Sequence, residues 1–178
     1  MYEVILYNED AIIKIRDAMP NAFATAINKT ANEAKTLITQ TVRQVYRVKA
    51  SDFSASYRLK RATPNQLYAI LSNRRKRLSL PSFYAVQRKT GVSVGVLQGA
   101  THIIPHTFLA TMKSGHIGVF VRRSKSRLPI RELKGLSPGQ MMVAHRVFDK
   151  VMPAIPDIFY TKVKHEAEWQ IAQKAAAQ

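Results

Sequence analysis

The sequence contains no cysteine among its 178 residues. Without cysteine the chain can form neither disulfide bonds nor thiolate metal sites, which suits assembly in a reducing cytoplasm. No apolar run approaches the roughly 18 residues that a membrane-spanning helix needs. The acidic start, MYEVILYNED, does not resemble a secretory signal, which would begin with basic residues. We therefore expect a soluble chain with no membrane segment and no disulfide framework.

Acidic residues are almost absent from the middle of the chain. Residues 43–134 hold 19 Lys and Arg but only two acids, Asp52 and Glu132, so this segment carries the whole formal net charge of +17. The rest of the chain is balanced, with nine basic and nine acidic side chains. A field of this size predicts a polyanionic or acidic neighbour, which is nucleic acid, an acidic protein surface or anionic lipid.

Recognisable catalytic patterns are also missing. Hydrolytic chemistry usually needs a carboxylate pair or an activated nucleophile, and the chain has neither a GxSxG nor a GxxxxGK[ST] sequence. His102 and His106 are four residues apart, a spacing that can bind zinc on a helix, but Pro105 between them argues against a helix. We predict that the protein is not an enzyme and has no cofactor and no metal. A small nuclease or ribosome-directed toxin is the weakest hypothesis.

The apolar pattern predicts an α+β fold in a single domain, residues 1–178. We expect an N-terminal arm or short helix over 1–19, a long helix over 20–48, a β-rich basic region over 54–133 and C-terminal helices over 138–178. The long helix should pack on a basic, mainly antiparallel sheet. Apolar residues at spacings of three and four predict that it buries Phe23, Ile27, Ala34 and Leu37 or Ile38 against that sheet.

Within the β-rich region, alternating and β-branched runs predict short strands bounded by turn residues. The expected strands cover residues 54–62, 66–72, 83–87, 91–99, 107–112, 116–121 and 128–133. The last of these should lie at a sheet edge, because Pro129 cannot donate to a ladder. In the C-terminal region we expect helices over 140–152 and 157–173, with Pro153 and Pro156 between them.

Two basic loops are the candidate sites of contact with a partner. They hold eight cations and no acid: Arg74, Arg75, Lys76, Arg77, Arg122, Arg123, Lys125 and Arg127. Tyr68, Phe83 and Tyr84 are close to the first loop in sequence, as in basic patches that bind nucleic acid. Charge measures the field and not the identity of the partner, so DNA and an acidic protein surface remain open alternatives.

The most specific stretch is FLATMKSGHIGVFVRRSKSRLPIREL, residues 108–133. With Pro105 before it and Gly135 after it, this stretch resembles the central block of the phage minor tail protein Z family. The segments AINKTA, at 26–31, and YRVKASD, at 46–52, also resemble that family. The resemblance covers roughly residues 20–150, whereas the four-cation run at Arg74 is less typical of the family.

This resemblance implies a structural minor tail protein of a long-tailed phage or prophage, which acts in tail completion and head–tail joining at the head-proximal end of the tail. The implied partners are other tail or neck proteins and further copies of the chain in a ring, for which the family's setting implies six-fold symmetry. The implied location is the virion tail, with assembly in the host cytoplasm and nonspecific contact with genome DNA.

The alternative hypothesis is a sequence-nonspecific nucleic-acid-binding protein that uses the same basic region. Such a protein should show a recognisable module, and we find neither a helix-turn-helix pattern nor a pair of stacking aromatic residues of the RNP type.

Overall fold

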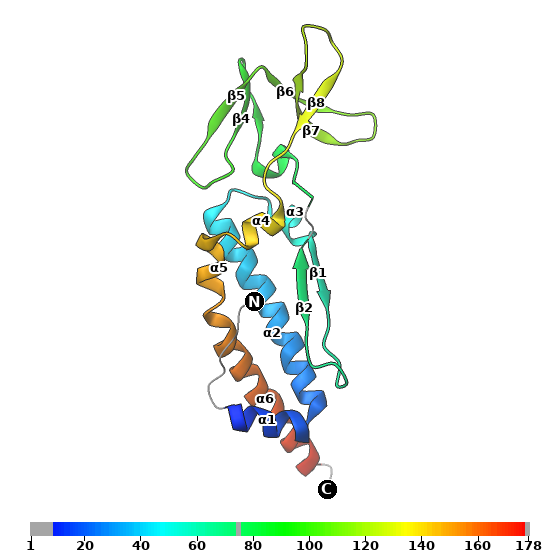
Figure 1. Ribbon diagram of the computed structural model, residues 1–178, viewed down its shortest axis with the longest axis vertical. Helices are drawn as coiled ribbons and strands as arrows, with labels where there is room; N and C mark the ends of the chain where they lie inside the picture. Colours follow the sequence, from blue (N-terminus) through cyan, green and yellow to red (C-terminus); the bar gives the residue numbers. More distant parts are fainter. Residues whose placement is uncertain (1–8, 74–75, 177–178) are drawn as a thin grey trace. The chain divides into compact units, whose positions relative to one another are not determined.

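A computed structural model describes residues 9–73 and 76–176 of the chain (Figure 1). The helices are α1 (Glu9–Ala18), α2 (Pro20–Val45), α3 (Ala50–Ser54), α4 (Pro138–Met142), α5 (His145–Val151) and α6 (Ala154–Ala176). The strands are β1 (Tyr57–Lys60), β2 (Ile70–Asn73), β3 (Val86–Gln87), β4 (Gly91–Val94), β5 (His102–Pro105), β6 (Thr107–Thr111), β7 (Ile117–Arg122) and β8 (Ile130–Leu133). This arrangement confirms the predicted α+β class, with a long N-terminal helix, antiparallel pairing and C-terminal helices.

The chain forms two compact units, which interleave in sequence. Among the described residues, the first unit comprises 9–38, 58–72 and 148–176, and the second comprises 39–57, 73 and 76–147. The two units also differ in charge. In the sequence, the segments of the second unit hold 17 of the 28 Lys and Arg but only two of the 11 acids. The second unit is therefore the strongly basic one.

The core of the first unit is formed mainly by helices. Phe23 and Ala26 of α2 are buried with Ile12 of α1 and Val163 of α6, and Ile27, Leu67 and Phe159 pack around them. The rings of Phe23 and Phe159 meet edge to face, with centroids 5.5 Å apart. The predicted burial of Phe23 is confirmed, but the elements that cover it are α1 and α6 rather than a sheet. An apolar stripe shows which side of a helix is buried and not what covers it.

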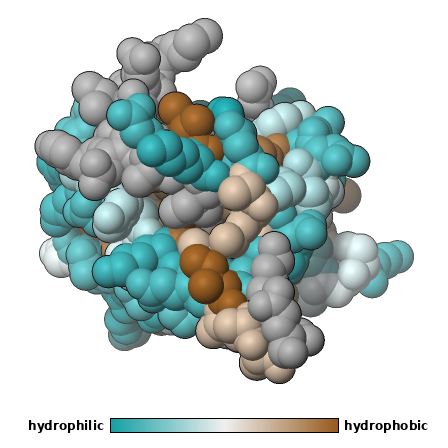
Figure 2. All heavy atoms as spheres, turned by 90° about the horizontal axis from the view of Figure 1, so that it is seen from below, coloured by the Kyte–Doolittle hydropathy of each residue, from teal (hydrophilic) through white to brown (hydrophobic). Residues whose placement is uncertain are grey.

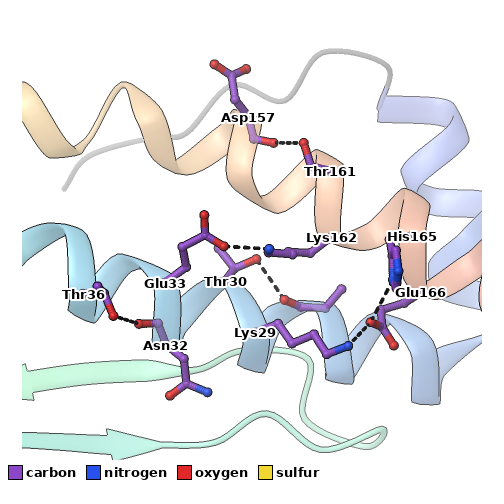
Figure 3. A network of polar contacts seen from close by, with 11 residues as sticks. Lys29, Thr30, Asn32, Glu33, Thr36, Asp157, Thr161, Lys162, His165 and Glu166 are labelled. Carbon is purple, nitrogen blue, oxygen red and sulfur yellow. Dashed lines mark hydrogen bonds and ion pairs between the residues drawn. The ribbon is translucent and has the colours of Figure 1, made fainter.

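Ion pairs join α2 to α6 beside this core (Figure 3). The Lys29 ammonium contacts the Glu166 carboxylate, which is almost fully buried, and Lys162 Nζ lies 2.7 Å from Glu33 Oε2. A buried carboxylate is tolerated only with a cation or hydrogen-bond donors beside it. These pairs therefore fix how the two helices face each other within the first unit.

Large hydrophobic side chains also lie on the surface of the first unit. Ile13 of α1, together with Trp169 and Ile171 of α6, is between 43% and 55% exposed. Figure 2 shows one face of the molecule, on which small hydrophobic patches lie between hydrophilic atoms. Isolated exposed apolar residues are normal on protein surfaces, so these side chains do not by themselves indicate a binding site.

The second unit contains two three-stranded antiparallel sheets, with strand orders β3-β4-β5 and β6-β7-β8. Phe53, Phe83, Val92, Val119 and Met141 are fully buried in this unit. The C-terminal end of α2 also belongs to it. There the backbone N–H of Gln98 donates to the carbonyl of Val45 and its side-chain amide donates to that of Arg43. These bonds satisfy carbonyl groups that a helix end otherwise leaves unpaired.

Several predicted elements differ from those observed. The strand expected at 54–62 is shorter, because α3 precedes it and only Tyr57–Lys60 is extended. The expected helix over 140–152 is two helices, α4 and α5, and α4 begins earlier with a capping box between Ser137 and Gln140. Residues Leu80–Phe83 form a 3-10 helix before the short β3, and the unpredicted strand β5 contains the HIIP sequence.

The predicted edge strand is confirmed, since β8 pairs with β7 and lies at the end of its sheet.

Candidate functional site

The first basic loop is described only in part. Arg74 and Arg75 lie outside the described residues, while Lys76 and Arg77 are exposed. These two side chains line a hollow of the second unit together with His116 and Ile117, at the start of β7. Exposure is the state expected for unpaired cations, which are costly to bury.

The second basic loop connects β7 to β8. Arg122, Arg123, Lys125 and Arg127 are all exposed. The Arg122 guanidinium lies 5.4 Å from the centroid of the Phe108 ring, a cation–π contact that holds the guanidinium over the sheet. The other three cations extend into solvent among serine residues, which do not neutralise them.

The structure does not bring the two loops together. Lys76 and Arg77 lie near the His116 end of β7, whereas Arg122 is the last residue of that strand. A six-residue strand is about 20 Å long, and Figure 1 shows the β6–β7 turn and the β7–β8 connection as separate loops. The six predicted contact residues that the structure describes therefore lie on two surfaces rather than one.

A groove of about 1150 Å³ lies between the two sheets of the second unit. Edge strands border it on both sides, with His102 and Ile104 from β5 and Arg131 and Leu133 from β8. Its other apolar lining residues are Leu80, Val94, Val96, Leu97, Leu136 and Ala144, and its other cations are Arg77, Lys134 and Arg146. The groove is thus lined by hydrophobic side chains with cations among them, and its acidic lining residue is Glu132.

Both carboxylate oxygen atoms of Glu132 have polar partners. Ser79 Oγ donates to Oε1 over 2.7 Å, and Nε2 of His116 lies 2.8 Å from the same oxygen. Lys134 Nζ lies 3.4 Å from Oε2 and forms a salt bridge with the carboxylate. Burial by itself would raise the pKa of Glu132, but the two hydrogen bonds and the Lys134 charge outweigh it, so the pKa lies below its usual value of 4.5.

The cluster of Ser79, His116 and Glu132 does not have the geometry of a catalytic triad. In a triad the imidazole accepts the serine proton while the acid orients the imidazole from its other side. Here the carboxylate lies between the other two groups, and the serine hydroxyl donates to it. The contacts instead link Ser79 and the start of β7 to β8, which is a structural role.

Sequence reasoning missed a cation–aromatic cluster on the second unit. The Arg47 guanidinium and the Lys49 ammonium lie 5.4 and 5.9 Å from the centroid of the Tyr84 ring, which is 43% exposed. The sequence places Arg47 and Lys49 after a long helix, where cations are ordinary. Their approach to Tyr84 depends on long-range backbone bonds from Arg47 to Val96 and from Lys49 to Ser82.

The two histidines of the HIIPH sequence are exposed at the two ends of β5. His106 has a positive φ of 57°, a left-handed conformation that turns the chain from β5 into β6. Across residues 9–73 and 76–176, no group of three or more His, Asp or Glu side chains is placed to hold a metal ion. In the same residues, no helix is both long and apolar enough to cross a bilayer.

Comparison with known families places these surfaces in context. A family model described as prophage minor tail protein Z matches residues 10–173, which covers most of the first unit, the whole of the second and all the residues of the groove. Comparison with curated proteins and with solved structures finds no match.

Proposed function

Because the chain belongs to the prophage minor tail protein Z family, we propose that it completes the phage tail at its head-proximal end and takes part in joining the tail to the head. The proposal rests on one observation, which is that the family model matches residues 10–173, almost the whole chain. Its location would then be the virion tail, with assembly in the host cytoplasm.

The proposed mechanism is assembly through protein surfaces, without turnover of a substrate. A head-to-tail contact between identical copies closes into a ring when the rotation allows it, and a ring fits the axis of a tail. The basic second unit would contact acidic tail or neck proteins. Its 17 cations repel one another in an isolated subunit, and an acidic neighbour would relieve that repulsion.

We also propose that the protein is not an enzyme. The best-formed polar cluster, that of Ser79, Glu132 and His116, supports this proposal because its serine lacks an imidazole base. The contacts of this cluster have a structural role, because they link Ser79 and the start of β7 to β8.

Nonspecific contact with DNA is the second candidate, and the cluster of Arg47, Lys49 and Tyr84 favours it. Aromatic rings beside cations can stack on bases while the cations bind phosphate groups. Such binding should be insensitive to DNA sequence and should weaken steeply with salt, since phosphate neutralisation releases counterions. An acidic protein partner should instead give a gentler salt dependence and a defined stoichiometry.

The test uses a phage that lacks the gene, complemented with the tagged chain. Gold-labelled antibody should mark the head-proximal end of tails in purified virions, and particles made without the chain should lack productive head–tail joints. Label at the distal tip, or the absence of the chain from purified tails, would overturn the proposal. Replacing Lys76 and Arg77 in one variant, and Arg123, Lys125 and Arg127 in another, should each lower the yield of infectious particles. If neither variant lowers it, both loops are solvated surface only.

A further inference from the structure

The groove of the second unit has the character of a peptide-binding site. Its lining is apolar, and Arg77, Arg131 and Arg146 lie among the lining residues. None of these three arginines forms an ion pair with another residue in the part of the chain that the structure describes. The Glu132 carboxylate is already bound by Ser79, His116 and Lys134. The groove therefore presents apolar contacts and uncompensated positive charge.

The groove also has a free strand edge. In its sheet, β5 pairs with β4 on one side, and no described strand pairs with its other side. An unpaired edge exposes backbone N–H and C=O groups that can bind a further extended segment. Leu97, which lines the groove, is 38% exposed. An extended segment with apolar side chains and acidic groups would match the apolar lining, the positive charge and the free edge of β5.

The residues before α1, MYEVILYN, are mainly apolar and contain Glu3, and Glu9 and Asp10 follow at the start of α1. The first ten residues have no Lys or Arg, and the Val, Ile, Leu and Tyr residues before α1 favour strands. Eight extended residues span up to about 26 Å, whereas a four-residue strand such as β5 is about 13 Å long. The segment is thus long enough to cover the strand edge.

We propose that the N-terminal segment of one copy binds in the groove of the next copy, as a strand added beside β5. The inference rests on the proposed assembly of identical copies, for which it supplies a contact. The basic units of two copies repel each other, so electrostatics favours a contact between the basic unit of one copy and a part of the other outside that unit. A contact between two different surfaces is head-to-tail and closes into a ring or continues as a filament.

The experiment uses the absence of native cysteine in the full chain. One preparation carries Val4→Cys, and a second carries Leu97→Cys in the groove. After mixing and mild oxidation, these two chains should form a disulfide-linked heterodimer. A matched control replaces Val86 by Cys. Val86 is 47% exposed on β3, at the opposite edge of the same sheet, and that mixture should give little cross-link.

Charge variants provide a second measurement on the full chain. Arg131→Glu with Arg146→Glu should weaken self-association in sedimentation velocity by about tenfold or more, since charge pairs across an interface favour binding. Arg88→Glu with Lys89→Glu makes the same change of charge at exposed positions outside the groove and should have a smaller effect. Equal effects of the two variants would show that net charge alone controls association and would overturn the proposal.

The outcomes separate this inference from the proposed function. Association of copies without the heterodimer overturns the proposed contact and leaves the tail function standing. A cross-link that forms only within one chain carrying both Val4→Cys and Leu97→Cys overturns the exchange between copies. A chain that neither associates nor enters virions contradicts both proposals.

Discussion

The imidazole Nε2 of His116 lies 2.8 Å from the Oε1 atom of Glu132, and this contact ties the residue before β7 to the middle of β8. Both residues belong to the stretch that carries the family resemblance. In the same stretch, Gly115 has a φ of +78°, which completes the turn between β6 and β7 and places His116. The characteristic residues of the stretch thus have a common structural purpose, which is to build the three-stranded sheet.

Replacing Glu132 by Gln should destabilise the protein near neutral pH by about 1–3 kcal/mol, because hydrogen bonds and an ion pair to a charged group are lost. The pKa of Glu132 is lowered in the folded state. Its contribution to stability is therefore complete above the ordinary value of 4.5 and is lost as the pH falls below it. Denaturant unfolding at neutral and acidic pH measures the difference, which should shrink on acidification. Glu168→Gln, at an exposed position, is the control, and a pH-independent difference would contradict the assignment.

Replacing Phe23 by Ala should cost about 3–5 kcal/mol of unfolding free energy, because the ring is 7% exposed and packs edge to face on Phe159. Leu37→Ala should cost less, toward the lower end of the roughly 2–5 kcal/mol range for core leucines, since Leu37 is only half-buried. Ile13→Ala, at a position 43% exposed, is the control. Denaturant unfolding checks the order, and an equal loss for Phe23 and Ile13 would contradict the described core.

Tyr57 should titrate above the ordinary tyrosine pKa of 10.0. Burial raises its pKa to about 12 from the ordinary 10.0, although a hydrogen bond with Thr39 opposes the shift. The folded state holds this proton more tightly than the unfolded state, so stability should fall as the pH rises through 10 toward 12. Absorbance of tyrosinate measures the titration, and Tyr57→Phe should remove the late component. Retention of that component in the variant would show that another tyrosine produces it.

Replacing Gly135 by Ala should destabilise the second unit by about 1–3 kcal/mol through overpacking. A Cβ at this position would lie 2.3 Å from a carbon of the Phe83 ring, which is fully buried. Phe83→Leu would create space for the added Cβ but would also destabilise the protein by itself. The loss of stability in the double variant should therefore be smaller than the sum of the losses in the two single variants. Thermal unfolding of all four proteins closes this double-mutant cycle. Additive losses would mean that the ring is not the obstacle.

The sequence by itself determined the distribution of charge along the chain and the identity of most elements. The new helix start at Pro20, the turn before His116 and the edge position of β8 follow from local chemistry, because proline and glycine restrict backbone geometry wherever they occur. The Ser137–Gln140 capping box can also be recognised in the sequence, since its two residues are three apart. It predicts the observed start of α4.

Only the tertiary structure decided which surfaces these elements form. The stripe that contains Phe23 could have been covered by a sheet or by a helix, and the ring of Phe159 shows that it is α6. Arg47 and Tyr84 are 37 residues apart in sequence, and backbone bonds between distant segments bring them together. The groove combines β5 with β8 in the same way. Contacts between distant residues depend on how the whole chain packs, and no local pattern encodes them.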